Sequence, residues 1–173
     1  ISKESLFKDK HQGVTEFLPS LGGNSLVNEI ENLNEVLKRP KKPMTAIIGG
    51  SKVSTKLKLL DNFVEIFDTI IIGGAMANTF LFNQGFNMGK SLLEKDLIVD
   101  INHILEKSKI YNCNVILPID LVCSKSFEDT SNVKIIDVKN VQSNQIALDI
   151  GNKTIKLIKS VLLNSKMILW NGP

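Results

Sequence analysis

The sequence predicts a three-layer α/β fold with a mainly parallel sheet. From Met44 onward, short apolar runs rich in β-branched residues alternate with longer segments of helical periodicity. The run Thr69–Ile72 is apolar after its threonine, as expected of a parallel strand buried on both faces. Two of the runs end at glycine pairs, Gly49-Gly50 and Gly73-Gly74. Strands that alternate with helices in this way form βαβ units around a parallel sheet.

The expected elements follow in chain order. A strand over 45–48 leads into a helix over 51–66, with Val53, Leu57, Leu60 and Val64 facing inward. The strand over 69–72 is followed by a short helix over 76–84. A longer helix over 92–109 has an apolar stripe of Leu93, Leu97, Ile101, Ile104 and Leu105. Further strands are expected over 115–117, 121–123, 133–138 and 166–170, with a helix over 154–163. The single tryptophan, Trp170, ends the last strand and is interpreted as core packing.

Two regions divide the chain. Residues 1–23 are predicted to be an N-terminal tail and interdomain linker, because the tail is polar and Pro19 to Gly23 has turn chemistry. Residues 24–173 are predicted to form the α/β domain. Its first helix is capped by Asn24 or Ser25 and ends at Arg39, before Pro40.

Composition excludes several classes of function. The 173 residues are 43% hydrophobic and 23% charged, with a net charge of +3 and no strongly basic block. This balance disfavours nucleic acid or an anionic membrane as the main partner. Cys113 and Cys123 have neither metal-site nor disulfide spacing, which indicates reduced, structural cysteines of a cytoplasmic protein.

The stretch Ala46–Lys56, AIIGGSKVSTK, has the features of a phosphate site. Glycines allow close approach of the backbone to a ligand, and the start of a helix favours an anion. In the predicted helix, Lys52 and Lys56 are four residues apart and share one face. The alternative is an ordinary strand–helix turn with two solvated lysines. The stretch matches neither G-x-x-x-x-G-K-[ST] nor G-x-G-x-x-G.

Three turns are predicted to meet at one edge of the sheet: Gly49-Gly50, Gly73-Gly74 and Asn171-Gly172-Pro173. Each follows an expected parallel strand. Ligands of open α/β sheets bind beyond the carboxyl ends of the strands. This edge is therefore the predicted site.

Four blocks resemble phosphoglycerate kinase, in the order of that family: AIIGGSKVSTKLKLL (46–60), IIIGGAMANTF (70–80), GKSL (89–92) and ILWNGP (168–173). The resemblance runs from about Gly13 to Pro173. It implies the Rossmann-like nucleotide-binding domain of that enzyme, incomplete at its C-terminal side.

The resemblance also implies roles for individual residues. Gly49 and Gly50, with Lys52 and Lys56 as the catalytic residues, would approach the nucleotide phosphates and the transferring phosphoryl group. Gly73 and Gly74 would floor the adenine pocket, although Ala75 stands where the family usually has a third glycine. Asn171 and Gly172 would lie at the phosphates, and Pro173 would cover the base. Leu148 would pack on the adenine; the alternative is a core leucine in a turn.

Two carboxylates are interpreted as structural, Asp149 in preference to a metal ligand. Asp149 is expected to cap the helix that follows it, and Asp120 is interpreted as structural in preference to polar lining of the cleft. No residue is assigned to a metal.

The function implied is reversible phosphoryl transfer between 1,3-bisphosphoglycerate and ADP, giving 3-phosphoglycerate and ATP in cytoplasmic glycolysis. The implied cofactor is ATP or ADP with Mg²⁺, whose family ligand has no counterpart before Pro173. The half of the family that binds phosphoglycerate has no counterpart either, so these residues alone are expected to show no turnover. The complete enzyme is expected to be a monomer. The alternative is a non-catalytic nucleotide-binding module or an inactive fragment.

Overall fold

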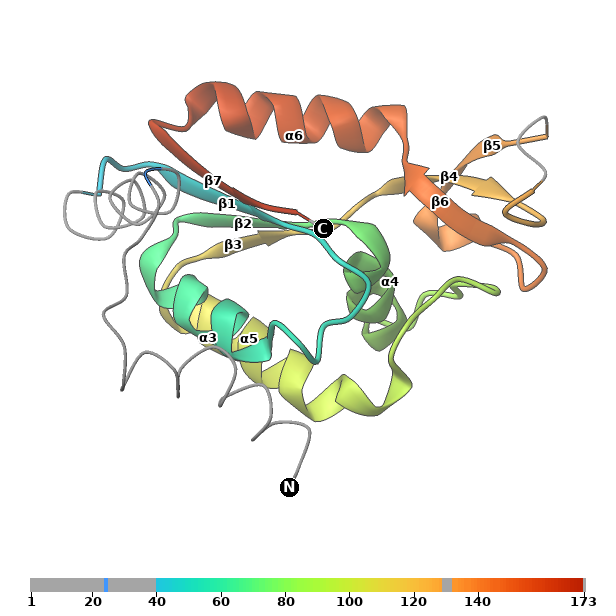
Figure 1. The fold of residues 1–173 in the computed structure, drawn as a ribbon, viewed down its shortest axis with the longest axis horizontal. Helices are drawn as coiled ribbons and strands as arrows, with labels where there is room; N and C mark the ends of the chain where they lie inside the picture. Colours follow the sequence, from blue (N-terminus) through green and yellow to red (C-terminus); the bar gives the residue numbers. More distant parts are fainter. Residues whose placement is uncertain (1–23, 25–39, 129–131, 173) are drawn as a thin grey trace. The chain divides into compact units, whose positions relative to one another are not determined.

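The computed structural model describes Asn24, residues 40–128 and residues 132–172. The tail and linker predicted over 1–23, residues 25–39 of the helix expected from Asn24, and the predicted site residue Pro173 lie outside these residues. Residues 41–173 form one compact unit. Within it, a parallel sheet lies between α6 (Asn152–Asn164) on one face and α3 (Leu57–Ile66) and α5 (Ile98–Ile110) on the other (Figure 1). This confirms the expected three layers.

The central sheet has four parallel strands in the order β3 (Asn114–Ile116), β2 (Thr69–Ile72), β1 (Met44–Ile48) and β7 (Met167–Asn171). In its register, Ile48 pairs with both Ile72 and Asn171. The glycine turns that follow β1 and β2 and the end of β7 therefore lie at one sheet edge, as predicted.

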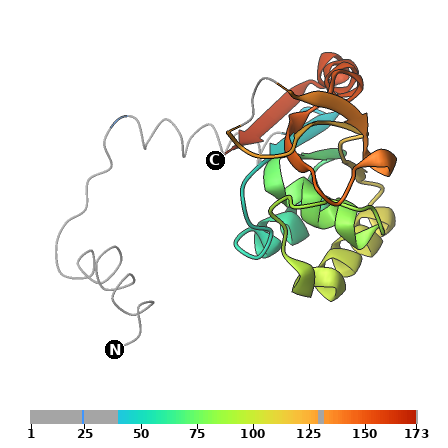
Figure 2. The ribbon, with the colours of Figure 1, turned by 90° about the vertical axis from the view of Figure 1, so that its right-hand side faces the viewer.

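A second sheet was not predicted. It joins β5 (Lys134–Asp137), β4 (Asp120–Ser124) and β6 (Ile146–Ile150) in antiparallel pairing. Figure 1 shows it beyond the carboxyl ends of the parallel strands, and Figure 2 views it from that side. Strands over 121–123 and 133–138 were expected, but in the parallel sheet. No strand was expected over 146–150, and a turn there was the alternative to a role of Leu148 at the adenine. Only nine residues separate β4 from β5, fewer than the roughly dozen that a crossover between parallel strands needs, so the two strands pair antiparallel.

The long helix begins later than expected. Residues 92–94 are not helical; Lys95–Leu97 form the 3₁₀ turn η2, and α5 starts at Ile98. The backbone of this segment bonds to α4 (Gly74–Asn83) instead: the Leu92 carbonyl accepts from Asn78 Nδ2 at 3.1 Å, and the Glu94 amide donates to Thr79 Oγ1 at 3.1 Å. Side chains of a neighbouring helix thus bond the backbone of residues 92–94 where a first helical turn was expected.

Each sheet has its own apolar core. Between the parallel sheet and the helices the largest buried side chains include Phe80, Met44, Ile48 and Ile70. Beneath the antiparallel sheet a separate cluster contains Leu81, Met88, Leu121, Cys123, Val138 and Val141, partly enclosed by the 3₁₀ turn η3 (Val138–Asn140). Helix α4 carries both Phe80 and Leu81 and so contributes to both cores.

Trp170 does not pack in the core, contrary to expectation. It is 77% exposed, and Ile168 on the same face of β7 is 46% exposed. β7 is an edge strand, and the described residues do not cover this part of its surface.

Candidate functional site

The three predicted turns are joined by backbone hydrogen bonds. The Gly49 amide donates to the Asn171 carbonyl at 3.0 Å, and the Gly73 amide donates to the Ile48 carbonyl at 2.9 Å. The Met76 amide, in the first turn of α4, donates to the Gly50 carbonyl at 3.1 Å. The edge of the sheet is therefore one connected surface of backbone.

Two of the glycines are required by their conformation. Gly50 has φ +150° and Gly74 has φ +63°, values that side chains with a Cβ rarely adopt. A Cβ on Gly74 would lie 3.0 Å from the Gly50 carbonyl oxygen. Gly73 is different, because a Cβ there would meet nothing within 4 Å. Gly74 lets the two turns approach each other closely.

The lysine loop (Ser51–Lys56) is not helical, which corrects the expectation of a helix from Ser51. α3 begins at Leu57, and the Lys56 amide closes a turn on the Val53 carbonyl at 2.8 Å. The side chain of Val53 is fully buried, as predicted, and anchors the loop to the core. Lys52 and Lys56 therefore do not share a helix face. Helix α4 instead presents its N-terminus here: it starts at Gly74, with no side-chain cap at Gly73.

Lys56 connects two of the turns. Its Nζ donates to the Gly49 carbonyl and to Asn171 Oδ1, both at 2.6 Å. An ammonium group has three donors, so one is left after these bonds. The Asn171 side chain, expected to reach a phosphate, here holds the lysine. Lys52 is exposed at the other end of the loop.

A cavity of about 240 Å³ adjoins the glycine turns. It lies between the start of α4 and the strand β6, which carries Leu148. Its lining includes Gly74, Ala75, Asn78, Leu92, Leu148 and Phe127. The structure thus brings Gly74 and Leu148, two predicted site residues that are far apart in the sequence, to one cavity. Phe127 was missed; it is 68% exposed in an irregular segment, so no periodic pattern marks it.

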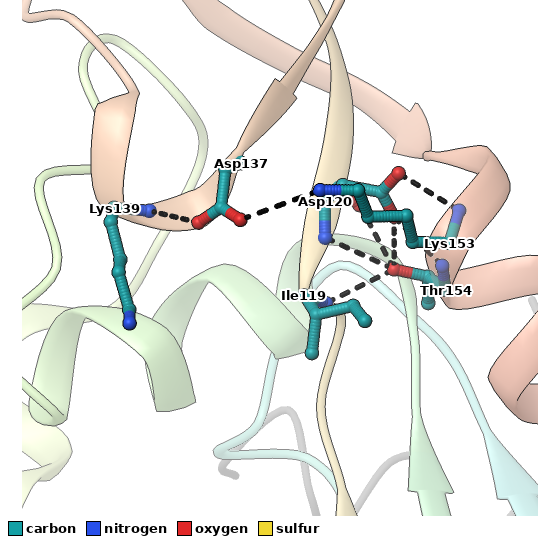
Figure 3. Close-up of polar contacts among 6 residues, drawn as sticks. All are labelled: Ile119, Asp120, Asp137, Lys139, Lys153 and Thr154. Carbon is teal, nitrogen blue, oxygen red and sulfur yellow. Dashed lines mark hydrogen bonds and ion pairs between the residues drawn. The ribbon is translucent and has the colours of Figure 1, made fainter.

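The N-terminus of α6 is occupied by a carboxylate from β4 (Figure 3). Asp120 is 2% exposed; its Oδ2 accepts from the Lys153 amide at 2.9 Å, and its Oδ1 accepts from the Thr154 amide at 2.8 Å and from Thr154 Oγ1 at 2.6 Å. Asp120 is therefore structural, as interpreted. The prediction that Asp149 caps α6 is wrong, because its Oδ1 accepts from the neighbouring Ile150 amide at 2.7 Å.

These bonds keep Asp120 ionised. Burial acts to raise the pKa of Asp120, but the hydrogen bonds from Thr154 and from the Lys153 and Thr154 amides outweigh it, and the net effect lowers the pKa. Lys153 adds a charge contact to Asp137 at 3.9 Å, and the Lys139 amide donates to Asp137 Oδ1 at 3.1 Å (Figure 3). Thr154 Oγ1 also accepts from the Ile119 amide at 3.0 Å. This network fixes α6 against β4, and backbone pairing joins β6, which carries Leu148, to the same strand.

Glu94 is a residue that sequence reasoning missed. Its carboxylate binds Ser54 in the lysine loop twice: Oε2 accepts from the Ser54 amide at 3.0 Å, and Oε1 from Ser54 Oγ at 2.6 Å. Glu94 follows closely on the block Gly89–Leu92 that carried part of the resemblance. Forty residues separate it from Ser54, so the pattern alone gives no sign of the contact.

Other features of the described chain differ from this edge in their chemistry. Among residues 40–128 and 132–172, no group of three His, Cys, Asp or Glu side chains could hold a metal ion. Another cavity, of about 300 Å³ between α3 and α5, contains none of the predicted site residues. Burial raises the pKa of the Cys113 thiol to about 11 and raises that of Cys123, so both stay protonated at neutral pH. No described helix is both long enough and apolar enough to span a bilayer.

Fold and geometry define the class first: a Rossmann-like α/β protein in which glycine turns, a lysine loop and a cavity gather at the carboxyl edge of a parallel sheet. The family follows from comparison with known proteins. A family model described as phosphoglycerate kinase matches residues 9–173, so the chain belongs to the phosphoglycerate kinase family.

Relatives and solved structures agree. Phosphoglycerate kinase of Borreliella afzelii (strain PKo) is 44% identical over 161 residues, and that of Francisella tularensis subsp. tularensis (strain WY96-3418) is 43% identical over 162. Each match covers 93% of this chain and 41% of the relative, so the chain spans about two fifths of their length. The structure of phosphoglycerate kinase from Coxiella burnetii aligns with a TM-score of 0.82 at 36% identity, over 87% of this chain and 39% of that one. The enzyme from Pyrococcus horikoshii OT3 has a TM-score of 0.74 at 24% identity, over 91% and 40%, and supports the fold.

Proposed function

We propose that this chain supplies part of the nucleotide site of a phosphoglycerate kinase. The reaction of the complete enzyme is reversible phosphoryl transfer between 1,3-bisphosphoglycerate and ADP, giving 3-phosphoglycerate and ATP in cytoplasmic glycolysis, by a monomer. The observation that carries the proposal is the meeting of Gly50, Gly74, Lys56 and Asn171 at one sheet edge, beside the cavity lined by Leu148.

The base of the nucleotide is assigned to the cavity. An adenine ring is flat and apolar on its faces, and it needs close backbone on one side and an aliphatic side chain on the other. Gly74 and Leu148 offer these two surfaces. The start of α4 adds a favourable dipole for the phosphates that follow. Gly73, Gly172 and Pro173 are assigned to the borders of the same site.

The phosphates are assigned to Gly49, Gly50 and the two lysines. Phosphoryl transfer requires positive charge on the transferring group and precise placement of the reactants, with little covalent chemistry from the protein. Lys56 is already placed by two hydrogen bonds and retains one donor for a phosphate oxygen. Lys52 is assigned to the transferring phosphoryl group.

Magnesium is assigned to the nucleotide rather than to this chain. The family's metal ligand has no counterpart in the blocks of resemblance, so no protein ligand is named. When bound, the ion would neutralise phosphate charge. The phosphoglycerate partner is likewise assigned to parts of the enzyme with no counterpart here, and these residues alone are expected to bind nucleotide without turning it over.

Titration calorimetry with ADP and with adenosine tests the nucleotide site. Wild type should bind both, with ADP the tighter. Lys56→Ala should weaken ADP binding by about ten- to a hundredfold, because a hydrogen bond to a charged group contributes about 1.5–3 kcal/mol, and should leave the affinity for adenosine unchanged. Lys156→Ala, which removes an exposed lysine of α6, is the matched control. Equal ADP affinity in Lys56→Ala and wild type would remove Lys56 from the site.

A coupled kinase assay distinguishes the enzyme from the alternative. In a complete chain containing this segment, Lys52→Ala should lower kcat more than it lowers ADP affinity, because its charge meets the phosphoryl group mainly in the transition state. Lys56→Ala should lower both. Nucleotide binding with no turnover even in the complete chain would favour the non-catalytic module. Absence of both would favour an inactive fragment.

A further inference from the structure

Glu94 is the only described residue whose side chain accepts hydrogen bonds from the lysine loop at two atoms. Its two oxygens take the amide and the hydroxyl of Ser54, which lies midway between Lys52 and Lys56. At its end the loop is also held by Lys56 Nζ, which donates to the Gly49 carbonyl and to Asn171 Oδ1. Its other contacts are short-range: Thr55 Oγ1 donates to the Lys52 carbonyl at 3.0 Å, and the Lys56 amide donates to the Val53 carbonyl. Local turns of this kind fix the shape of a loop but not its position.

Glu94 is itself held in place. Its amide donates to Thr79 Oγ1, and two residues earlier the Leu92 carbonyl accepts from Asn78 Nδ2. Asn78 is 5% exposed and Thr79 is 1% exposed, so both are fixed parts of α4. The same helix binds the Gly50 carbonyl through the Met76 amide. Helix α4 therefore fixes the entrance of the loop directly and its middle through Glu94.

The segment before Glu94 contacts β6, the strand that lines the cavity assigned to the nucleotide base. Ser91 Oγ accepts from the Ala147 amide at 2.8 Å, and the Lys90 amide donates to the Gln145 carbonyl at 2.7 Å. Ala147 precedes Leu148 on β6. Residues 90–94 thus connect the strand that lines the cavity with the loop that carries the lysines.

We propose that Glu94 is a positioning residue for the lysine loop, which holds Lys52 and Lys56 toward the phosphates of a nucleoside diphosphate without touching the ligand. The proposal rests on the proposed function for the identity of the ligand. The two hydrogen bonds between Glu94 and Ser54, called the Glu94 clamp, do not depend on that function.

The charge of Glu94 suits this role. Burial acts to raise the pKa of Glu94. The hydrogen bonds from Ser54 and from the Val53 amide, together with the positive charge of Lys52, outweigh burial, so the net effect lowers this pKa. The carboxylate is ionised at neutral pH, and hydrogen bonds to an ionised acceptor are about twice as strong as neutral ones.

The test compares Glu94→Ala and Glu94→Gln with wild type in the full chain. Glu106→Ala, which removes an exposed glutamate of α5, is the matched control. Three quantities are measured: ADP affinity, adenosine affinity, and the rate of endoproteinase Lys-C cleavage after Lys52 and Lys56. Adenosine lacks the phosphates, so it reports the cavity without the lysines.

Glu94→Ala should weaken ADP binding by about tenfold, with adenosine affinity within about twofold of wild type. Cleavage after Lys52 and Lys56 should accelerate by about tenfold, because the loop opens without global unfolding. Glu94→Gln keeps one acceptor oxygen for Ser54 and should fall between Glu94→Ala and wild type. Glu106→Ala should match wild type in all three.

Glu94→Ala with wild-type ADP affinity and wild-type cleavage would overturn the proposal. So would an equal loss of ADP and adenosine affinity, which would indicate a general structural role. If Glu94→Ala does not fold, Glu94→Gln and Ser54→Ala decide: unchanged ADP affinity and cleavage in both overturn it. If wild type itself binds no ADP, the proposed nucleotide site of this chain fails, and the cleavage rates alone judge the clamp.

Discussion

Single residues decide how closely the two glycine turns approach. Gly73 and Gly74 are adjacent and identical in the sequence, yet they differ physically. Gly73 has φ −124°, which any residue adopts, whereas Gly74 has φ +63° and lies against the Gly50 backbone. The requirement for glycine therefore belongs to one member of the pair.

This difference predicts unequal effects of the same substitution. Gly74→Ala should lower the free energy of unfolding by about 1–2 kcal/mol for the left-handed conformation alone, and further for the contact with Gly50. Gly73→Ala should change it by less than about 0.5 kcal/mol, because space is open there. Urea unfolding of both variants measures the difference. Equal destabilisation by the two changes would contradict the assigned backbone conformations.

At the scale of elements, contacts from distant segments override local patterns. α6 is capped by Asp120, which precedes it by more than thirty residues, and not by the neighbouring Asp149. The lysine loop and residues 92–94 were expected to be helical; in the structure their backbone groups bond to Glu94 and to α4. In each case a side chain from another element bonds the backbone at the place where a helix was expected to begin.

The Asp120 cap predicts a pH-dependent stability. Because folding lowers the pKa of Asp120 below its unfolded value of about 3.9, its contribution is complete above that value and disappears as the pH falls through the folded pKa. Asp120→Asn should destabilise the protein by about 2 kcal/mol at pH 7, since an amide nitrogen cannot accept from the Lys153 amide. Its unfolding free energy should then decline less steeply below pH 4 than that of wild type.

Urea unfolding at several pH values between neutral and about 3 measures this effect. Asp149→Asn is the matched control, because Asp149 is exposed and bonds only its neighbour's amide. A wild-type acid profile in Asp120→Asn would show that other carboxylates cause the acid loss.

At the scale of the whole molecule, burial is unevenly distributed. The cores on either side of α4 are closed, whereas β7 leaves Ile168 and Trp170 exposed at the edge of the parallel sheet. Large apolar side chains on a sheet edge are uncommon in isolated domains, because edges are templates for further pairing. β7 pairs with β1 on one side, and no described strand pairs with its outer edge.

Two aromatic substitutions test this distribution. Trp170→Ala should change the free energy of unfolding by less than about 0.5 kcal/mol, because the side chain is 77% exposed. Phe80→Ala, at 0% exposure, should cost about 3–5 kcal/mol. Trp170 is the single tryptophan, so the fluorescence of the native chain should also resemble that of tryptophan in water. Emission of a buried indole, or a large loss of stability in Trp170→Ala, would contradict the exposed edge.

The sequence alone determined the parallel sheet, because apolar β-branched runs, helical periodicity and glycine at strand ends are all local signals. It also placed Gly49-Gly50, Gly73-Gly74 and Asn171 at one edge, since parallel strands end together. Only the tertiary structure decided the antiparallel sheet, the Asp120 cap and the Glu94 clamp. These three features depend on contacts between residues that are distant in the sequence. Such contacts can outweigh the secondary structure that the local pattern predicts. The helical start expected for Lys52 and Lys56 failed for this reason: burial of Val53 and the carboxylate of Glu94 hold the loop in a form that periodicity does not describe.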